Sequence, residues 1–242
     1  MTDRRLVFWR HGRTEWNAGR RFQGQTDVPL DATGRRQAAH AASVLSRLDP
    51  DRIISSDLSR ASETAQALAD LAGLPVTTDE RLRETFAGEW QGLTRDELES
   101  RFGEDLARWS SGSEIRPGGG ETRVEVATRM VAAVDSVLEE LQSGQTLVIA
   151  THGGSARAAI GALLGLPPEY WAVLGVLTNC AWSVLVENPP APSGEHLGPA
   201  WRLQEYNAGS LPAGSGGRSL TGEPTGERTA VIVYRSESRK GL

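Results

Sequence analysis

A short apolar segment that ends in an arginine, a histidine and a glycine constrains the fold of this chain most. The residues from Leu6 to Trp9 are all apolar, and Arg10, His11 and Gly12 follow directly. An unbroken apolar run is typical of a strand buried on both faces, as in a parallel sheet. Ligands of such α/β folds bind beyond the carboxyl ends of the strands. Because Arg10 carries a fixed charge and His11 can titrate or attack, the segment predicts anion chemistry.

Two later apolar runs repeat this arrangement. The run at Ile53 to Ser55 leads within a few residues to Arg60, and the run at Leu147 to Ala150 leads to His152. Parallel strands end at one edge of a sheet, so we expect two arginines and two histidines to converge on one pocket. A single histidine is more often structural or exposed, and this interpretation fits the other two, which lie mid-helix and in a loop rich in proline and glycine: His40 and His196.

Predicted strands and helices alternate along most of the chain. Helical spacing of apolar residues predicts helices over the ranges 35–48, 57–72, 94–113, 121–142 and 155–164, with Asp31 or Thr33 as the first N-cap. Strands are expected at 6–9, 52–55, 76–78, 146–151, 181–186 and 201–206, the last two compatible with antiparallel pairing. This alternation predicts an α/β fold with three layers, in which a mainly parallel central sheet carries helices on both faces.

The composition changes near the C-terminus. From residue 208 onward glycine, serine, proline, threonine and glutamate dominate, which predicts one domain over residues 1–207 and a flexible tail over residues 208–242. A short β-prone run at 229–234 could dock locally.

Charge and cysteine content exclude several classes of protein. A net charge of −5 argues against general binding of nucleic acid or an acidic membrane surface, which call for a basic face. Cys180 is the only cysteine, so no internal disulfide or cysteine metal cluster is expected. The N-terminus has too few apolar residues for a signal peptide, and no stretch approaches a membrane span. We therefore expect a cytoplasmic protein.

Several ordered blocks together resemble the histidine phosphatase superfamily, the phosphoglycerate-mutase-like proteins. The resemblance runs from about residue 6 to residue 186. It implies the phosphoglycerate-mutase-like fold, with a small helical cap insertion at about 88–121. The blocks that carry it are Arg10–Gly12 with Thr14, Glu15 and Asn17, Gln23–Gln25 with Asp27 and Gly34, Ser55–Arg60 with Thr64, Leu82–Glu84 with Trp90 and Gly92, Pro117–Glu121, and Thr151–Gly154.

The resemblance implies a phosphoryl-transfer site. His11 is implied to be the nucleophile that forms a phosphohistidine, with Arg10, Arg60 and His152 around the phosphoryl oxygens. His11 must be neutral to attack, so its pKa has to stay low among these cations. Fixed guanidinium groups can cancel the negative charge that Mg²⁺ cancels elsewhere, so no metal and no cofactor are expected.

Glu84 is implied to be the general acid that protonates the leaving oxygen and afterwards the base that activates water. This role calls for a carboxyl pKa raised toward neutral. The spacing alone leaves another interpretation open, in which Glu84 forms a surface salt bridge with Arg81 or Arg83.

Weaker expectations concern the residues that bind the substrate. Asn17, Gln23 and the backbone at Gly24 could donate neutral hydrogen bonds. Gly153, at the predicted start of a helix with Gly154 after it, would add amide dipoles near the anion. Arg13 could also touch the substrate.

The insertion separates two activities that share this chemistry. Phosphoglycerate mutases carry Glu-Arg-His-Tyr-Gly and an Asn-Lys pair here, whereas residues 84–94 of this chain contain neither the tyrosine nor the lysine. Fewer anion contacts favour transfer to water, so we expect a phosphatase. Phosphoglycerate mutase and a non-catalytic phospho-ligand-binding module remain alternatives.

The resemblance also suggests substrates and partners. Blocks at 81–85, 90–94, 179–182 and 201–208 favour a small phosphate ester of the phosphosugar or phosphoglycerate type, such as glucosyl-3-phosphoglycerate, with α-ribazole phosphate still open. No nucleic-acid or membrane partner is expected. The strand at 181–186 could be an exposed edge that supports a homodimer.

Overall fold

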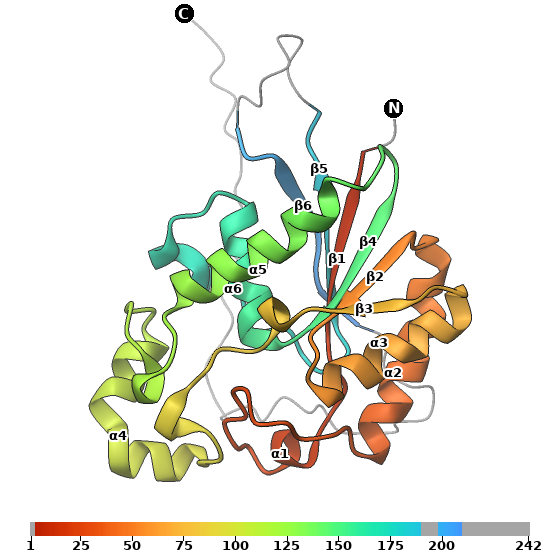
Figure 1. Cartoon of the computed structure of the whole chain (residues 1–242). Helices are drawn as coiled ribbons and strands as arrows, with labels where there is room; N and C mark the ends of the chain where they lie inside the picture. Colours follow the sequence, from red (N-terminus) through yellow and green to blue (C-terminus); the bar gives the residue numbers. More distant parts are fainter. Residues whose placement is uncertain (1–2, 190–197, 210–242) are drawn as a thin grey trace, which may run out of the picture. The chain divides into compact units, whose positions relative to one another are not determined.

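A six-stranded sheet forms the centre of the computed structural model, which describes residues 3–189 and 198–209. Its strand order is β3-β2-β4-β1-β5-β6 (Figure 1). The first four strands of this order run parallel, whereas β5 pairs antiparallel with β1 and β6 pairs antiparallel with β5. The strands are β1 (Arg5–Arg10), β2 (Arg52–Ser55), β3 (Val76–Thr78), β4 (Thr146–Thr151), β5 (Trp182–Glu187) and β6 (Trp201–Ala208). The predicted mainly parallel sheet is confirmed.

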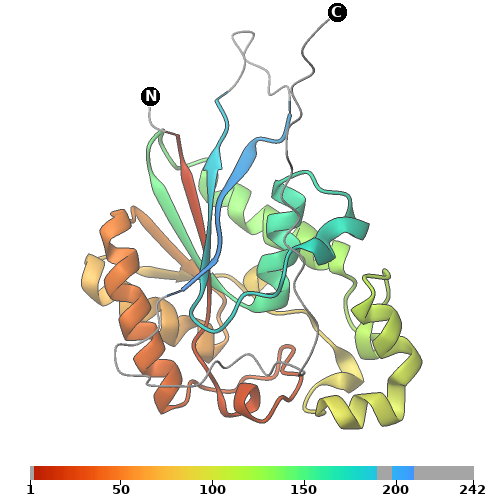
Figure 2. The same ribbon diagram turned by 180° about the vertical axis from the view of Figure 1, so that it is seen from behind.

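Helices cover both faces of the sheet. Along β1, Leu6 and Phe8 pack with α5 (Arg123–Leu138) and α6 (Gly153–Leu163), whereas Val7 and Trp9 pack on the opposite side. That second side is covered by two helices that Figures 1 and 2 show in orange: α2 (Ala32–Leu45) and α3 (Ser59–Ala72). Alternate side chains of one strand therefore enter different cores. This explains why the strand is apolar at every position and confirms the three layers.

Capping residues set where the helices begin. The Asp31 side chain accepts a hydrogen bond from the Gly34 amide at 2.7 Å, so Asp31 rather than Thr33 caps α2. Thr94 and Thr122 form capping boxes that start α4 (Arg95–Ser110) and α5. The predicted helices at 94–113 and 121–142 thus begin one or two residues later and are shorter at their C-terminal ends.

Residues 86–121 form an excursion from the sheet that contains α4. The Glu121 amide donates to the Phe86 carbonyl at 2.8 Å and joins the two ends of the excursion. Two short helical turns lie near these ends, η3 (Gly88–Trp90) and η4 (Pro117–Gly119). Figure 1 shows α4 beyond the carboxyl ends of β1 and β4, on the same side as α1 (Glu15–Ala18). The excursion packs through one aromatic cluster, whose rings make edge-on or tilted contacts: Phe22, Trp90, Phe102 and Trp109.

The remaining differences lie at element ends. The helix expected from residue 155 begins at Gly153, directly after β4, and β6 continues to Ala208, where a tail was predicted. Residues 210–242, the β-prone run at 229–234 and His196 lie outside the described residues. Three short turns complete the fold: η1 (Ser46–Leu48), η2 (Glu80–Leu82) and η5 (Pro168–Val173). No helix in residues 3–189 and 198–209 has the length and apolar character needed to cross a membrane.

Candidate active site

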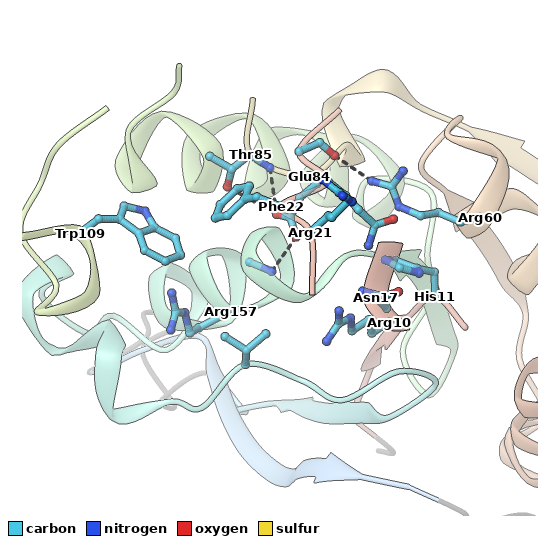
Figure 3. A pocket seen from close by; sticks show the side chains of 14 residues that line it. Arg10, His11, Asn17, Arg21, Phe22, Arg60, Glu84, Thr85, Trp109 and Arg157 are labelled. Carbon is cyan, nitrogen blue, oxygen red and sulfur yellow. Dashed lines mark hydrogen bonds between the residues drawn. The ribbon is translucent and has the colours of Figure 1, made fainter. Parts of the chain in front are cut away.

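Three strand ends open into one cavity of about 170 Å³ (Figure 3). β4 lies between β1 and β2 and runs parallel to both, so the segments that follow these strands meet at one edge. The cavity is lined by Arg10, His11, Asn17, Arg21, Phe22, Gln23, Gly24, Arg60, Glu84, Thr85, Trp109, Gly154, Arg157 and Val176.

His11 follows β1 and presents one ring nitrogen for chemistry. Its Nδ1 lies 2.7 Å from the Gly12 carbonyl oxygen. A carbonyl only accepts, so this contact assigns the proton to Nδ1 and leaves Nε2 with a lone pair. Burial lowers the pKa of His11 well below its usual value, and the charges of Arg60 and Arg10 lower it further. His11 is therefore neutral near pH 7, as a nucleophile requires.

Arg10 ends β1 and extends its guanidinium beside His11. Nη1 donates to the Leu177 carbonyl, while the buried Nε has no hydrogen-bond partner among the described residues. Burial lowers the pKa of Arg10, and the Glu84 carboxylate partly offsets this effect. Arg10 thus retains donor capacity that an anion can use.

Arg60 lies in the first turn of α3 and is fully buried. Nη1 donates to the Thr26 carbonyl and Nη2 to the Gly24 carbonyl, both at 2.8 Å. Burial lowers its pKa to about 10, so the guanidinium stays charged near neutral pH. Two carbonyls therefore hold Arg60 in a fixed orientation without cancelling its charge.

His152 lies behind Arg60 rather than in the cavity wall. Its Nδ1 accepts a hydrogen bond from Arg60 Nε at 3.2 Å, so Nε2 carries the proton and donates to Ser56 Oγ at 2.9 Å. The ring is fully buried, and its centroid is 5.1 Å from that of His11. Burial and the nearby cations lower the pKa of His152 well below its usual value. In this arrangement His152 positions Arg60.

Glu84 caps the start of α6. Its carboxylate accepts backbone N–H bonds from Gly154 and Ser155 at 2.9 Å each and from Thr85 at 2.8 Å. Backbone donors at a helix start favour a negative charge. The Gly154 amide that was expected near the anion is thus bound to Glu84.

The surface salt bridge considered for Glu84 is wrong. Arg81 pairs with Asp79 at 2.6 Å, and Arg83 pairs with Asp57. Both arginines thus have other carboxylate partners, and Glu84 is left to face the cavity.

Asn17 and Gln23 contribute neutral groups to the wall. Asn17 Oδ1 accepts from the Thr14 amide at 3.1 Å and from Asn179 Nδ2 at 3.2 Å, and Gln23 Oε1 accepts from Thr14 Oγ at 3.0 Å. With both oxygens occupied, the amino groups remain as donors, an assignment that rests on this network. Gly24 also lines the cavity and has a positive φ of 52°.

Three residues predicted from the sequence lie outside the cavity lining: Arg13, His152 and Gly153. Arg13 Nε donates to Asp31 Oδ2 at 2.7 Å, so its charge is already paired. Gly153 lies next to Arg10, because a Cβ at this glycine would be 3.3 Å from the Arg10 guanidinium. The absence of a side chain at Gly153 leaves space for Val176, which would be 2.7 Å from that Cβ, and for Arg10.

Sequence reasoning missed several residues of the cavity lining, among them Arg21, Phe22, Trp109 and Arg157. Arg157 could have been found, because it lies three residues after Gly154 on the same helix and therefore near the same face. Trp109 comes from the excursion, and nothing in its local sequence indicates which part of the sheet edge it reaches.

A comparison with protein-family models assigns the chain to a family. The model for the histidine phosphatase superfamily (branch 1) matches residues 6–197. The chain belongs to this superfamily. Glucosyl-3-phosphoglycerate phosphatase from Mycolicibacterium vanbaalenii is 42% identical over 88% of this chain and 98% of its own length. A protein named probable phosphoglycerate mutase GpmB, from Yersinia enterocolitica, is 40% identical over 72% of this chain and 80% of its own length.

Solved structures agree with this assignment. A mycobacterial glucosyl-3-phosphoglycerate phosphatase in complex with VO3 matches with a TM-score of 0.75 and 40% identity, covering 85% of this chain and 99% of that one. Among the described residues of this superfamily member, no group of three or more histidine, cysteine, aspartate or glutamate side chains is placed to hold a metal ion.

Proposed function

We propose that this chain is a phosphatase that hydrolyses glucosyl-3-phosphoglycerate, or a closely similar phosphate ester, through a phosphohistidine on His11. The observation that carries the proposal is a neutral His11 whose free Nε2 lies in a cavity also lined by Arg10 and Arg60. The substrate is suggested by the similarity to glucosyl-3-phosphoglycerate phosphatases.

In the first half of the reaction, His11 Nε2 forms a bond to phosphorus while the bond between phosphorus and the ester oxygen breaks. Glu84 in its protonated form gives its proton to that oxygen, which leaves as an alcohol. Arg10 and Arg60 face the phosphoryl oxygens and stabilise their charge, and the amino groups of Asn17 and Gln23 add neutral donors. This charge stabilisation is our basis for proposing that the reaction needs no metal ion.

In the second half, Glu84 is ionised and takes a proton from water. The water oxygen forms a bond to phosphorus, the bond from phosphorus to His11 breaks, and inorganic phosphate leaves. The three backbone N–H donors to Glu84 hold its carboxyl group in a fixed position for this step.

Phosphoglycerate mutase is the second candidate, because relatives named as probable mutases match at 40% identity. A mutase has to retain a bisphosphate long enough to return its phosphoryl group. Residues 84–94 contain neither the tyrosine nor the lysine expected for that task. We therefore favour transfer to water.

Two further properties belong to this proposal. A cytoplasmic location fits the free, buried thiol of Cys180, since reducing compartments preserve thiols. The strand predicted at 181–186 is not an exposed edge, because β5 is buried between β1 and β6. The edge available for a homodimer is β6, which is the last strand of the sheet order and has several exposed residues. Sedimentation of the purified chain tests the dimer.

A panel of esters tests the proposed activity. The purified full chain, with EDTA present, should release phosphate from glucosyl-3-phosphoglycerate with a higher kcat/KM than from 3-phosphoglycerate, α-ribazole phosphate or p-nitrophenyl phosphate. His11→Ala should lower turnover at least about 10³-fold and abolish acid-labile ³²P labelling, because the nucleophile is gone. Labelling that survives in His11→Ala, or no turnover of any ester between about pH 5 and 8, would reject the proposal.

A further inference from the structure

Arg157 is a charged residue in the cavity wall that the proposed reaction does not use. It lies on α6, is half-buried, and has no hydrogen bond or ion pair within residues 3–189 and 198–209. Figure 3 shows it beside Trp109, at the end of the cavity away from Arg60. A half-buried guanidinium without a partner is costly, because water no longer fully solvates its charge.

The surroundings of Arg157 add positive charge instead of cancelling it. Arg123 donates to the carbonyls of Trp109 and Ser113 and lies 5.0 Å over the Trp109 ring, but it forms no ion pair within the described part of the chain. Burial lowers the pKa of Arg123, and the charge of Arg157 lowers it further, while the Glu114 carboxylate partly offsets these effects. Arg123 therefore does not neutralise Arg157.

Nearby groups that could compensate for the charge of Arg157 are neutral or already occupied. Glu114, the carboxylate that acts on Arg123, accepts a hydrogen bond from the Val124 amide at 3.2 Å. Burial raises the pKa of Tyr206, next to Arg157, to about 12, so the phenol does not ionise near pH 7. Glu84 is bound to three backbone amides. By contrast, another arginine of the cavity lining has partners: Arg21 donates to the Gly92 carbonyl at 2.7 Å and lies 3.5 Å from Glu97.

We propose that Arg157 determines specificity by binding a carboxylate on the alcohol portion of the substrate, while Trp109 and Phe22 contact the sugar. This inference rests on the proposed function, because it places the phosphoryl group at His11. The substrate class is then phosphate esters of hydroxy acids that also carry a sugar.

A carboxylate fits this end better than a second phosphate does. One guanidinium fork satisfies the two oxygens of a planar carboxylate. The phosphoryl end instead gathers two arginines and two amide side chains, whereas Arg157 has the Trp109 ring beside it in the cavity wall (Figure 3). A dianionic phosphate placed here would keep oxygens without donors.

Paired substrates test the inference. We compare glucosyl-3-phosphoglycerate with the glucosylglycerol phosphate that has a CH₂OH group in place of the carboxylate, and with p-nitrophenyl phosphate. Arg157→Gln should lower kcat/KM about 10- to 100-fold on the carboxylate ester, mainly through KM, and less than about 3-fold on the other two. Arg157→Lys keeps the charge but not the forked guanidinium group. Its kcat/KM on the carboxylate ester should lie between those of the wild type and Arg157→Gln.

The matched control is Arg36→Gln on the exposed side of α2, which should leave all three rates unchanged. If Arg157→Gln fails to fold, product inhibition of the wild-type enzyme tests the inference instead. Glucosylglycerate should compete with the substrate, and neutral glucosylglycerol should not. Equal losses on both sugar esters, or equal inhibition by both products, would overturn the inference. A wild-type enzyme inactive on every ester would instead reject the proposed function.

Discussion

The proposed mechanism gives Glu84 a task beyond the one that the structure shows. Its carboxylate holds the start of α6, and in the proposal the carboxyl group also gives a proton to the leaving oxygen. In Glu84→Gln the side-chain oxygen can still accept from a backbone amide, but the proton donor is lost. We expect kcat/KM to fall about 10²- to 10⁴-fold on an alkyl phosphate and less than about 10-fold on p-nitrophenyl phosphate, whose leaving group needs little protonation.

The ratio kcat/KM is the right measure here because it reports on the steps up to formation of the phosphohistidine. It therefore isolates the acid role of Glu84 from its later role as a base. Glu80→Gln, which changes an exposed carboxylate of the same segment, should leave kcat/KM unchanged on both substrates. Equal losses on both substrates in Glu84→Gln would mean that Glu84 is not the acid.

The sequence predicted which residues gather at the site better than it predicted what each one touches. His11 follows an apolar strand directly and Arg60 comes within a few residues of one, so topology alone places them at one edge. The position of His152 depends instead on its hydrogen bonds. Its two ring nitrogens are bound to Arg60 and Ser56, so neither faces the cavity. Short-range patterns do not encode such long-range hydrogen bonds.

At the scale of elements, the loop after β1 packs backbone to backbone against the first turn of α2. A Cβ added at Gly34 would lie 2.0 Å from the Arg13 carbonyl oxygen, and one added at Gly12 would lie 2.5 Å from the Gly34 carbonyl oxygen. Neither contact can be relieved by rotating a side chain. The two glycines therefore fix the distance between the helix and the segment that carries His11.

We expect Gly34→Ala to lower the free energy of unfolding by about 1 to 3 kcal/mol, because the loop must shift. A displacement of about 1 Å at His11 should also lower kcat about 10²-fold. Urea denaturation and steady-state kinetics measure the two effects. Gly103→Ala in α4, where an added Cβ meets nothing within 4 Å, should leave kcat unchanged and not reduce stability.

Element boundaries show what local patterns can and cannot predict. The strand at Val76–Thr78 and the one at Thr146–Thr151 are found where the residue pattern predicted them. The helices α4 and α5 begin later than predicted because Thr94 and Thr122 cap them and are not part of them. The arrangement of α4 over the cavity follows from aromatic contacts between residues far apart in the sequence, such as Phe22 with Trp109 at 5.5 Å.

For the whole molecule, the same burial that keeps His11 and His152 neutral makes folding sensitive to acid. The pKa values of His11 and His152 lie well below 6.5 in the folded state, whereas both rings take up protons near pH 6.5 once the chain unfolds. Between these values the unfolded state binds more protons than the folded state. The stability is therefore complete above about pH 6.5 and decreases as the pH falls below it.

Each histidine should contribute a slope of up to about 1.4 kcal/mol per pH unit, measured by urea denaturation between about pH 7.5 and 5. The aspartates whose pKa values are lowered by arginine, Asp57 and Asp79, begin to lose stabilisation only near pH 4, below this window. We therefore expect His11→Asn and His152→Asn each to flatten the slope, and the double variant to remove most of it. A double variant that keeps the wild-type slope would show that other groups set the acid sensitivity.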